Sequence, residues 1–102
     1  MRRNVAFGDE VTRLWRRHQH ADLPARLQGV LVGGVDLAAL DVDLADCIGT
    51  WRAGGGLLDD NRRQDLIQGV DTLDAVLPLL TSRVESLYFG RLRQLATVAL
   101  ES

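Results

Sequence analysis

Hydrophobic residues recur every three or four positions through most of the chain, which is the spacing of an α-helix with one buried face. Val11, Leu14 and Trp15 follow this spacing shortly after Asp9, a residue type that often caps a helix start. Pro24 comes soon afterwards and lacks the backbone N–H that a continuing helix needs. The pattern therefore predicts a first helix over about 9–20.

A connector of different composition occupies residues 28–35. It combines a short β-branched run with the pair Gly33 and Gly34, the composition of a tight turn between two short extended pieces. Two pieces of this length cannot bury a core of their own. The sequence therefore predicts an extended connector or a small hairpin.

The segment 36–51 is the most distinctive part of the chain, because it joins an apolar helical face to a row of aspartates. At about 100° per residue, one arc carries Leu37, Leu40, Leu44, Cys47, Ile48 and Trp51. The flank of this arc carries Asp36, Asp43 and Asp46. Asp36 also suits the N-cap, and Gly54–Gly56 end the helix. We predict an acidic helix over 36–51.

Two further helices complete the pattern. Residues 60–77 carry leucine and valine at helical spacing behind Asp59 or Asp60 as the N-cap, and a proline then interrupts them. Ser82 and Glu85 match a reciprocal capping box, and the helix that they begin reaches about residue 99. Because the loops are short, the 102-residue chain predicts an all-α fold, a small antiparallel four-helix bundle in one domain.

The last helix, within 80–100, is apolar around more than half of its circumference. This breadth predicts a helix at the centre of the bundle, and the alternative is a homodimer whose seam runs along 80–100. Arg91 projects into the same apolar arc, where a buried guanidinium needs an anion. The aspartate row is the nearest source in the sequence, so we predict a structural ion pair between Arg91 and Asp36.

Composition places the chain among ordinary globular proteins, with 46% hydrophobic and 25% charged residues. The formal net charge of -2 sets up no strong field, and the one basic cluster is Arg13, Arg16 and Arg17. This cluster lacks the recognition helix or stacking platform typical of nucleic-acid binding, so we expect no nucleic-acid partner. All twelve basic residues are arginine, which we interpret as the base composition of a GC-rich bacterial genome.

The compartment follows from cysteine usage and from the chain start. A single cysteine, Cys47, cannot close a disulfide within the chain, and its place on the apolar arc predicts a reduced, packed thiol. The twin arginines near the start precede Gly8 and two acidic residues rather than the apolar run of an export signal. No stretch approaches the roughly 18 apolar residues of a membrane span. We expect a cytoplasmic protein without membrane association.

Candidate catalytic and metal-binding residues do not assemble into a complete site. His18 and His20 are two positions apart, so on a helix they point in different directions, and we expect both in solvent at the helix end. Asp43 and Asp46 would suit a cation, but paired carboxylates on a surface helix usually serve solvation. The aspartates around Cys47 oppose a reactive thiolate. The sequence thus predicts no metal, no cofactor and no catalytic residue, and an enzyme is the less favoured class.

These observations favour a small helical protein-interaction module, such as an inhibitor, an immunity protein or an adaptor, whose protein partner the sequence does not identify. The acidic helix 36–51 is its predicted contact surface. Asp43, Asp46 and Trp51 are the predicted partner-binding residues, because an indole beside carboxylates is typical of a protein-binding patch. One alternative is a small-ligand or enzymatic domain with a pocket near Arg91 and Tyr88. The other is the homodimeric structural protein.

Overall fold

The computed structural model describes residues 2–101, with side chains described from Glu10 onward. Four α-helices lie within this range, and they confirm the predicted all-α fold. The elements are α1 (Arg2–His20), η1 (Ala25–Leu27), β1 (Leu31–Val32), β2 (Val35–Asp36), α2 (Leu37–Ala53), α3 (Asp60–Val76), η2 (Leu77–Leu79) and α4 (Arg83–Glu101), where η marks a short 3₁₀ turn. None of the helices in the described part of the chain has the length and apolarity needed to cross a bilayer.

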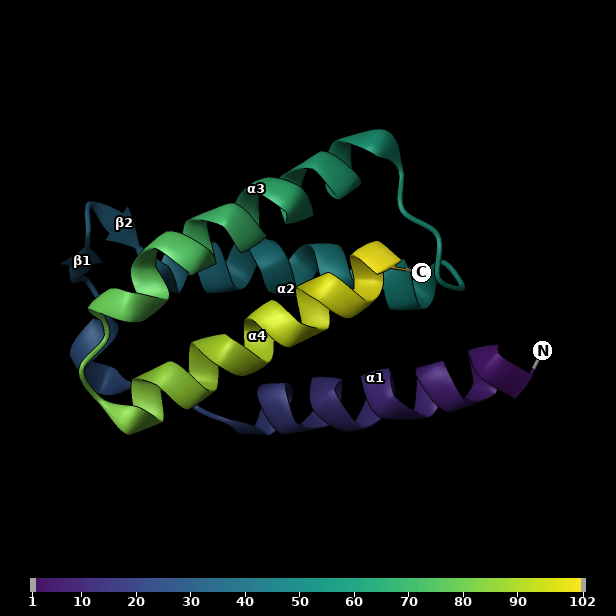
Figure 1. Ribbon diagram of the computed structural model, residues 1–102, viewed down its shortest axis with the longest axis horizontal. Helices are drawn as coiled ribbons and strands as arrows, with labels where there is room; N and C mark the ends of the chain where they lie inside the picture. Colours follow the sequence, from purple (N-terminus) through teal and green to yellow (C-terminus); the bar gives the residue numbers. More distant parts are fainter. Residues whose placement is uncertain (1, 102) are drawn as a thin grey trace.

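The four helices run in alternate directions, as Figure 1 shows, and the molecule extends over 42 × 25 × 19 Å along its principal axes. The helix α4 lies in the middle and contacts α1, α2 and α3, which confirms its predicted central position. The helices α1 and α3 lie on opposite sides of it, and α2 lies behind it in the view of Figure 1. The central helix therefore holds the bundle together.

Most element boundaries agree with the sequence pattern. Asp36 caps α2 by accepting a hydrogen bond from the backbone N–H of Ala39 (3.2 Å), and Asp59 caps α3 in the same way for Arg62 (2.8 Å). The largest difference is at the start of α1, which begins at Arg2 rather than near residue 9. Elongation of an existing helix adds one hydrogen bond per residue, so a helix can extend beyond its apolar stripe.

The predicted small hairpin is confirmed at residues 31–36, where β1 and β2 pair antiparallel with Leu31 opposite Asp36. Its turn residues, Gly33 and Gly34, have φ of 57° and 81°, a region that glycine enters without steric cost. The side chain of Leu79 lies so close to Gly33 that a methyl group there would overlap it. The hairpin is thereby packed against η2.

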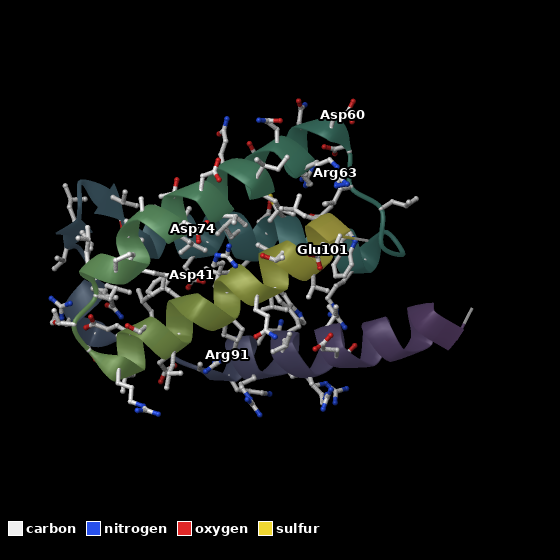
Figure 2. All side chains as sticks on the ribbon, in the orientation of Figure 1. Asp41, Asp60, Arg63, Asp74, Arg91 and Glu101 are labelled. Atoms are coloured by element: carbon white, nitrogen blue, oxygen red, sulfur yellow. The ribbon has the colours of Figure 1, made fainter. Side chains whose placement is uncertain are left out.

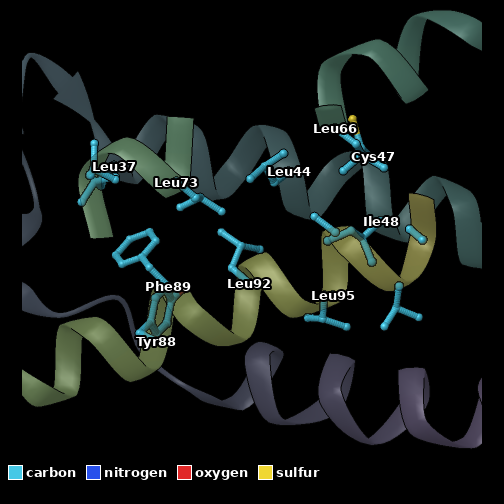
Figure 3. Close-up of a cluster of buried hydrophobic side chains, with 14 of the residues drawn as sticks. Leu37, Leu44, Cys47, Ile48, Leu66, Leu73, Tyr88, Phe89, Leu92 and Leu95 are labelled. Carbon is cyan, nitrogen blue, oxygen red and sulfur yellow. The ribbon is translucent and has the colours of Figure 1, made fainter. Parts of the chain in front are cut away.

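The core lies along α4 and faces the other helices (Figure 3). Phe89, Leu92 and Leu95 of α4 are fully buried, and they lie among fully or almost fully buried side chains of α2 and α3 that include Leu44, Ile48, Leu66 and Leu73. Two contacts at the surface also join α3 to α4 (Figure 2). Arg93 forms an ion pair with Asp74, and the guanidinium of Arg63 donates to the carbonyl oxygen of Leu100 at the end of α4.

A partly buried ion pair joins η1, the short turn before the hairpin, to α4. The Glu85 side chain is only 4% exposed and accepts two hydrogen bonds from Arg26, at 2.7 Å from Nε and 2.6 Å from Nη2. The predicted capping box is therefore only half formed. The backbone N–H of Glu85 does donate to the hydroxyl of Ser82 (3.4 Å), but the Glu85 carboxylate is used by Arg26 instead of the helix start.

The helices α2 and α3 pack tightly at Gly69, which is buried against the side chain of Leu44. We expect Gly69→Ala to lower the free energy of unfolding by about 1–3 kcal/mol, because the added methyl overlaps a side chain that is itself 2% exposed. Gly90→Ala on α4 is the matched control, since a methyl there meets nothing within 4 Å. Urea denaturation of both variants tests the contact, and equal stability would contradict it.

The pair of Glu85 and Arg26 also predicts a pH dependence. Hydrogen bonding to Arg26, foremost, holds the pKa of Glu85 below its ordinary value of 4.5. A lowered pKa means that the pair stabilises the fold above pH 4.5 and that this contribution is lost as the pH falls through the lowered pKa. We therefore expect the melting temperature of Glu85→Gln to fall less than that of the wild type when the pH is lowered from about 7 to about 3. The exposed Glu101→Gln is the control, and parallel curves for all three proteins would argue against the pair.

Candidate functional site

A groove of about 510 Å³ runs along the surface between α2 and α3. Its lining is drawn about equally from the two helices and comprises Leu40, Asp43, Leu44, Asp46, Cys47, Asn61, Arg62, Asp65, Gln68, Gly69 and Thr72. The close packing of Gly69 on Leu44 brings the two helices together at this point, so polar side chains of both helices border one depression.

The rim of the groove is acidic. Asp43 and Asp46 come from α2 and Asp65 comes from α3, and all three are exposed. Among the residues that the structure describes, none of these three carboxylates forms a hydrogen bond or an ion pair with a side chain. Asp43 and Asp46 thus lie on an outward flank of α2, as predicted. Their carboxylates form no contact that holds the described fold together.

The floor of the groove is apolar, because Leu44 and Cys47 are buried and Leu40 is half-buried. Burial, foremost, raises the pKa of the Cys47 thiol, and the negative charge of Asp65 raises it further. The thiol therefore stays protonated at neutral pH and serves as part of the floor.

One cation also borders the groove. Arg62 donates from Nη1 to Asp59 at the start of α3 (3.1 Å), and its Nε is buried without a hydrogen-bond partner. The rim therefore carries three carboxylates and one guanidinium, which is already paired with Asp59, so its net charge is negative. Within residues 10–101, no set of three or more histidine, cysteine, aspartate or glutamate side chains has the geometry of a metal site. The chemistry of the groove suits a long cationic side chain whose stem covers leucine and whose head meets carboxylates.

A second polar cluster lies inside the bundle and joins three helices. Asp41 on α2 (Figure 2) accepts a hydrogen bond of 2.6 Å from the Tyr88 hydroxyl of α4. Its other oxygen lies 2.8 Å from Nε2 of His18 on α1. The rings of His18 and Tyr88 are 4.8 Å apart at their centroids.

The cluster has a defined proton arrangement. Burial, foremost, and the hydrogen bond to Asp41 raise the pKa of Tyr88 far above its usual value of 10, so its hydroxyl remains a donor. A hydrogen bond between the His18 imidazole and an ionised Asp41 requires the proton on Nε2, because an ionised carboxylate only accepts. The other ring nitrogen of His18, Nδ1, is buried without a partner. The cluster therefore works as a polar tie between α1, α2 and α4.

The structure places the other predicted site residues differently from expectation. Trp51 is 5% exposed and belongs to the core, which removes it from the predicted partner-binding surface. No ion pair joins Arg91 to Asp36 among the described residues, because the Asp36 carboxylate caps α2. Figure 2 shows Arg91 on the side of α4 that is turned toward α1, and its Nη1 is buried without a partner.

Sequence reasoning missed His18 and Asp41, although a signal was present for each. His18 lies at helical spacing from Val11 and Trp15, and Asp41 lies on the same arc as Leu37 and Leu44. The expectation that His18 is solvated is wrong, since the side chain is 5% exposed. A polar residue on an apolar helical arc indicates that its side chain has a hydrogen-bond partner inside the fold.

The polar tie predicts a large loss of stability when its shared acceptor is removed. We expect Asp41→Ala to lower the free energy of unfolding by about 2–4 kcal/mol, because it leaves two buried donors unpaired, and Tyr88→Phe to lower it by about 1 kcal/mol. Asp43→Ala, a change of the same kind at an exposed position of the same helix, serves as the control and should stay within about 0.5 kcal/mol of the wild type. Chemical denaturation measures all three, and an Asp41→Ala protein as stable as Asp43→Ala would refute the tie.

No family model, no curated protein and no solved structure matched this chain.

Proposed function

We propose that this chain is a small cytoplasmic helical protein-interaction module, of the inhibitor, immunity-protein or adaptor kind, whose contact surface is the groove between α2 and α3. The observation that supports the proposal is the set of unpaired carboxylates Asp43, Asp46 and Asp65 around an apolar floor. A groove of this composition suits an amphipathic basic helix, which lays apolar groups and side-chain stems on the floor and guanidinium or ammonium groups on the rim.

The charge of the rim contributes most to the rate and selectivity of association. Carboxylates at the edge of an interface attract a basic partner over a distance of about one Debye length, roughly 8–10 Å at physiological salt. Their contribution to affinity is smaller, because exposed ion pairs are screened by salt. The proposed module therefore captures its partner quickly and releases it when salt is raised.

The alternative small-ligand pocket near Arg91 and Tyr88 has less support. The Tyr88 hydroxyl is committed to Asp41 inside the bundle, and neither Tyr88 nor Arg91 lines the groove. A ligand at this place would have to displace the polar tie that holds α1 to the rest of the fold.

The proposal is tested with a fluorescein-labelled helical peptide of leucine and arginine arranged on opposite faces. We expect Asp43→Ala combined with Asp46→Ala to weaken peptide binding by about tenfold, which corresponds to about 1.4 kcal/mol for two partly exposed charge pairs. Fluorescence anisotropy at low and at physiological salt measures the dissociation constant.

The matched control is Asp71→Ala combined with Glu101→Ala, which removes the same charge from exposed positions that do not line the groove. It should bind within about twofold of the wild type, because only long-range attraction has changed. Equal binding by the wild type and by the Asp43 and Asp46 double variant would refute the proposed contact surface.

A further inference from the structure

The outer face of α1 is basic and unpaired. Arg13, Arg16 and Arg17 are exposed and fall within an arc of about 100° on the helix, opposite the buried side chains of Val11 and His18. Among the described residues, these three guanidinium groups form no hydrogen bond and no ion pair. The face is therefore available to a partner.

This basic face matches the acidic groove in spacing. Arg13 and Arg16 are three positions apart on α1, and Asp43 and Asp46 are three positions apart on α2. Side chains at this separation on a helix are neighbours, with about 5–6 Å between their Cβ atoms. Two helices lying side by side can therefore form both arginine–aspartate pairs at once, and Arg17 remains for Asp65 across the groove.

The two faces cannot meet within one molecule. Figure 1 shows α1 and α3 on opposite sides of α4, and the buried face of α1 is fixed against α4. The exposed arginines consequently lie on the face of α1 that is turned away from α4. Within residues 10–101 of one molecule the basic face and the acidic groove therefore do not pair with each other, and a second copy can bring them together.

We propose that the basic face of α1, defined by Arg13, Arg16 and Arg17, docks in the acidic groove between α2 and α3 of a second copy of this chain. The proposal rests on the proposed function, because it names the partner of the same groove. Arginine suits this contact, since its stem covers the leucines of the floor while its planar head pairs with a carboxylate.

The interface joins two different surfaces, so each copy offers one donor face and one acceptor groove. Such a heterologous contact forms a closed ring when the rotation between copies closes, and an extending chain when it does not. The net charge of the whole chain is only -2, so long-range repulsion between copies is weak and the local faces decide the outcome.

The experiment is a charge swap followed by sedimentation. We expect the wild type to associate at low salt and to dissociate as salt is raised from about 0.05 M to about 0.5 M. The Arg13→Glu, Arg16→Glu variant and the Asp43→Arg, Asp46→Arg variant should each associate at least about tenfold more weakly. An equimolar mixture of the two variants should associate again, because the exchanged charges are complementary between them.

A crosslink checks the same contact where charge reversal disturbs folding. In a Cys47→Ser background, Arg16→Cys on one copy and Asp46→Cys on another should be joined by a short bismaleimide crosslinker, because an arginine–aspartate pair keeps its Cβ atoms farther apart than a disulfide spans. The control pair is Arg16→Cys with Asp71→Cys, which places the second thiol on α3 outside the groove lining. A crosslink of equal yield in the control pair would overturn the proposal.

The outcomes separate this inference from the proposed function. A wild type that remains monomeric at high concentration and low salt, while it still binds the basic peptide through Asp43 and Asp46, overturns self-association and leaves the groove as a site for another protein. Association that persists in both charge-reversed variants also overturns the inference, because the copies would then meet through a different face, such as residues 80–100.

Discussion

The shared carboxylate of Asp41 is the interaction on which the arrangement of this molecule depends. The Asp41 side chain is only 16% exposed, so its carboxylate needs donors inside the protein, and these come from two other helices, Tyr88 of α4 and His18 of α1. This requirement fixes how α1 is rotated about its own axis. With His18 turned inward, Arg13 and Arg16 must face solvent, so an internal hydrogen bond determines which surface the molecule presents outside.

The aspartates of α2 and of its N-cap have three different roles within a few helical turns. Asp36 satisfies a backbone N–H at the helix start, Asp41 holds two neighbouring helices, and Asp43 and Asp46 border the groove. Only the last two carry charge that no contact among the described residues neutralises. The aspartates that look alike in the sequence therefore fall into two groups. Asp36 and Asp41 stabilise the fold, and the exposed pair Asp43 and Asp46 supports the proposed function.

The groove depends on close helix packing as well as on charge. A residue without a side chain at Gly69 allows Leu44 to lie directly against the α3 backbone, which sets α2 and α3 near enough for their aspartates to border one depression. The same packing gives the groove its apolar floor. The glycine–leucine contact thus contributes both to fold stability and to the candidate contact surface, while the Asp41 contacts orient the basic face of α1.

The sequence by itself determined the four helices and the Asp36 cap, because these follow from local spacing and capping chemistry. It left open whether the connector is extended or a hairpin, whether Asp59 or Asp60 caps α3, and whether the broad apolar arc of α4 is central or a homodimer seam. Only the tertiary structure decided that His18 and Trp51 are buried and that Arg26, rather than a helix start, takes the carboxylate of Glu85. It also set Asp41, rather than Asp36, against the neighbouring helices. The physical reason is that a periodic pattern fixes which residues share a face, whereas the partner of each polar group depends on which faces meet after packing.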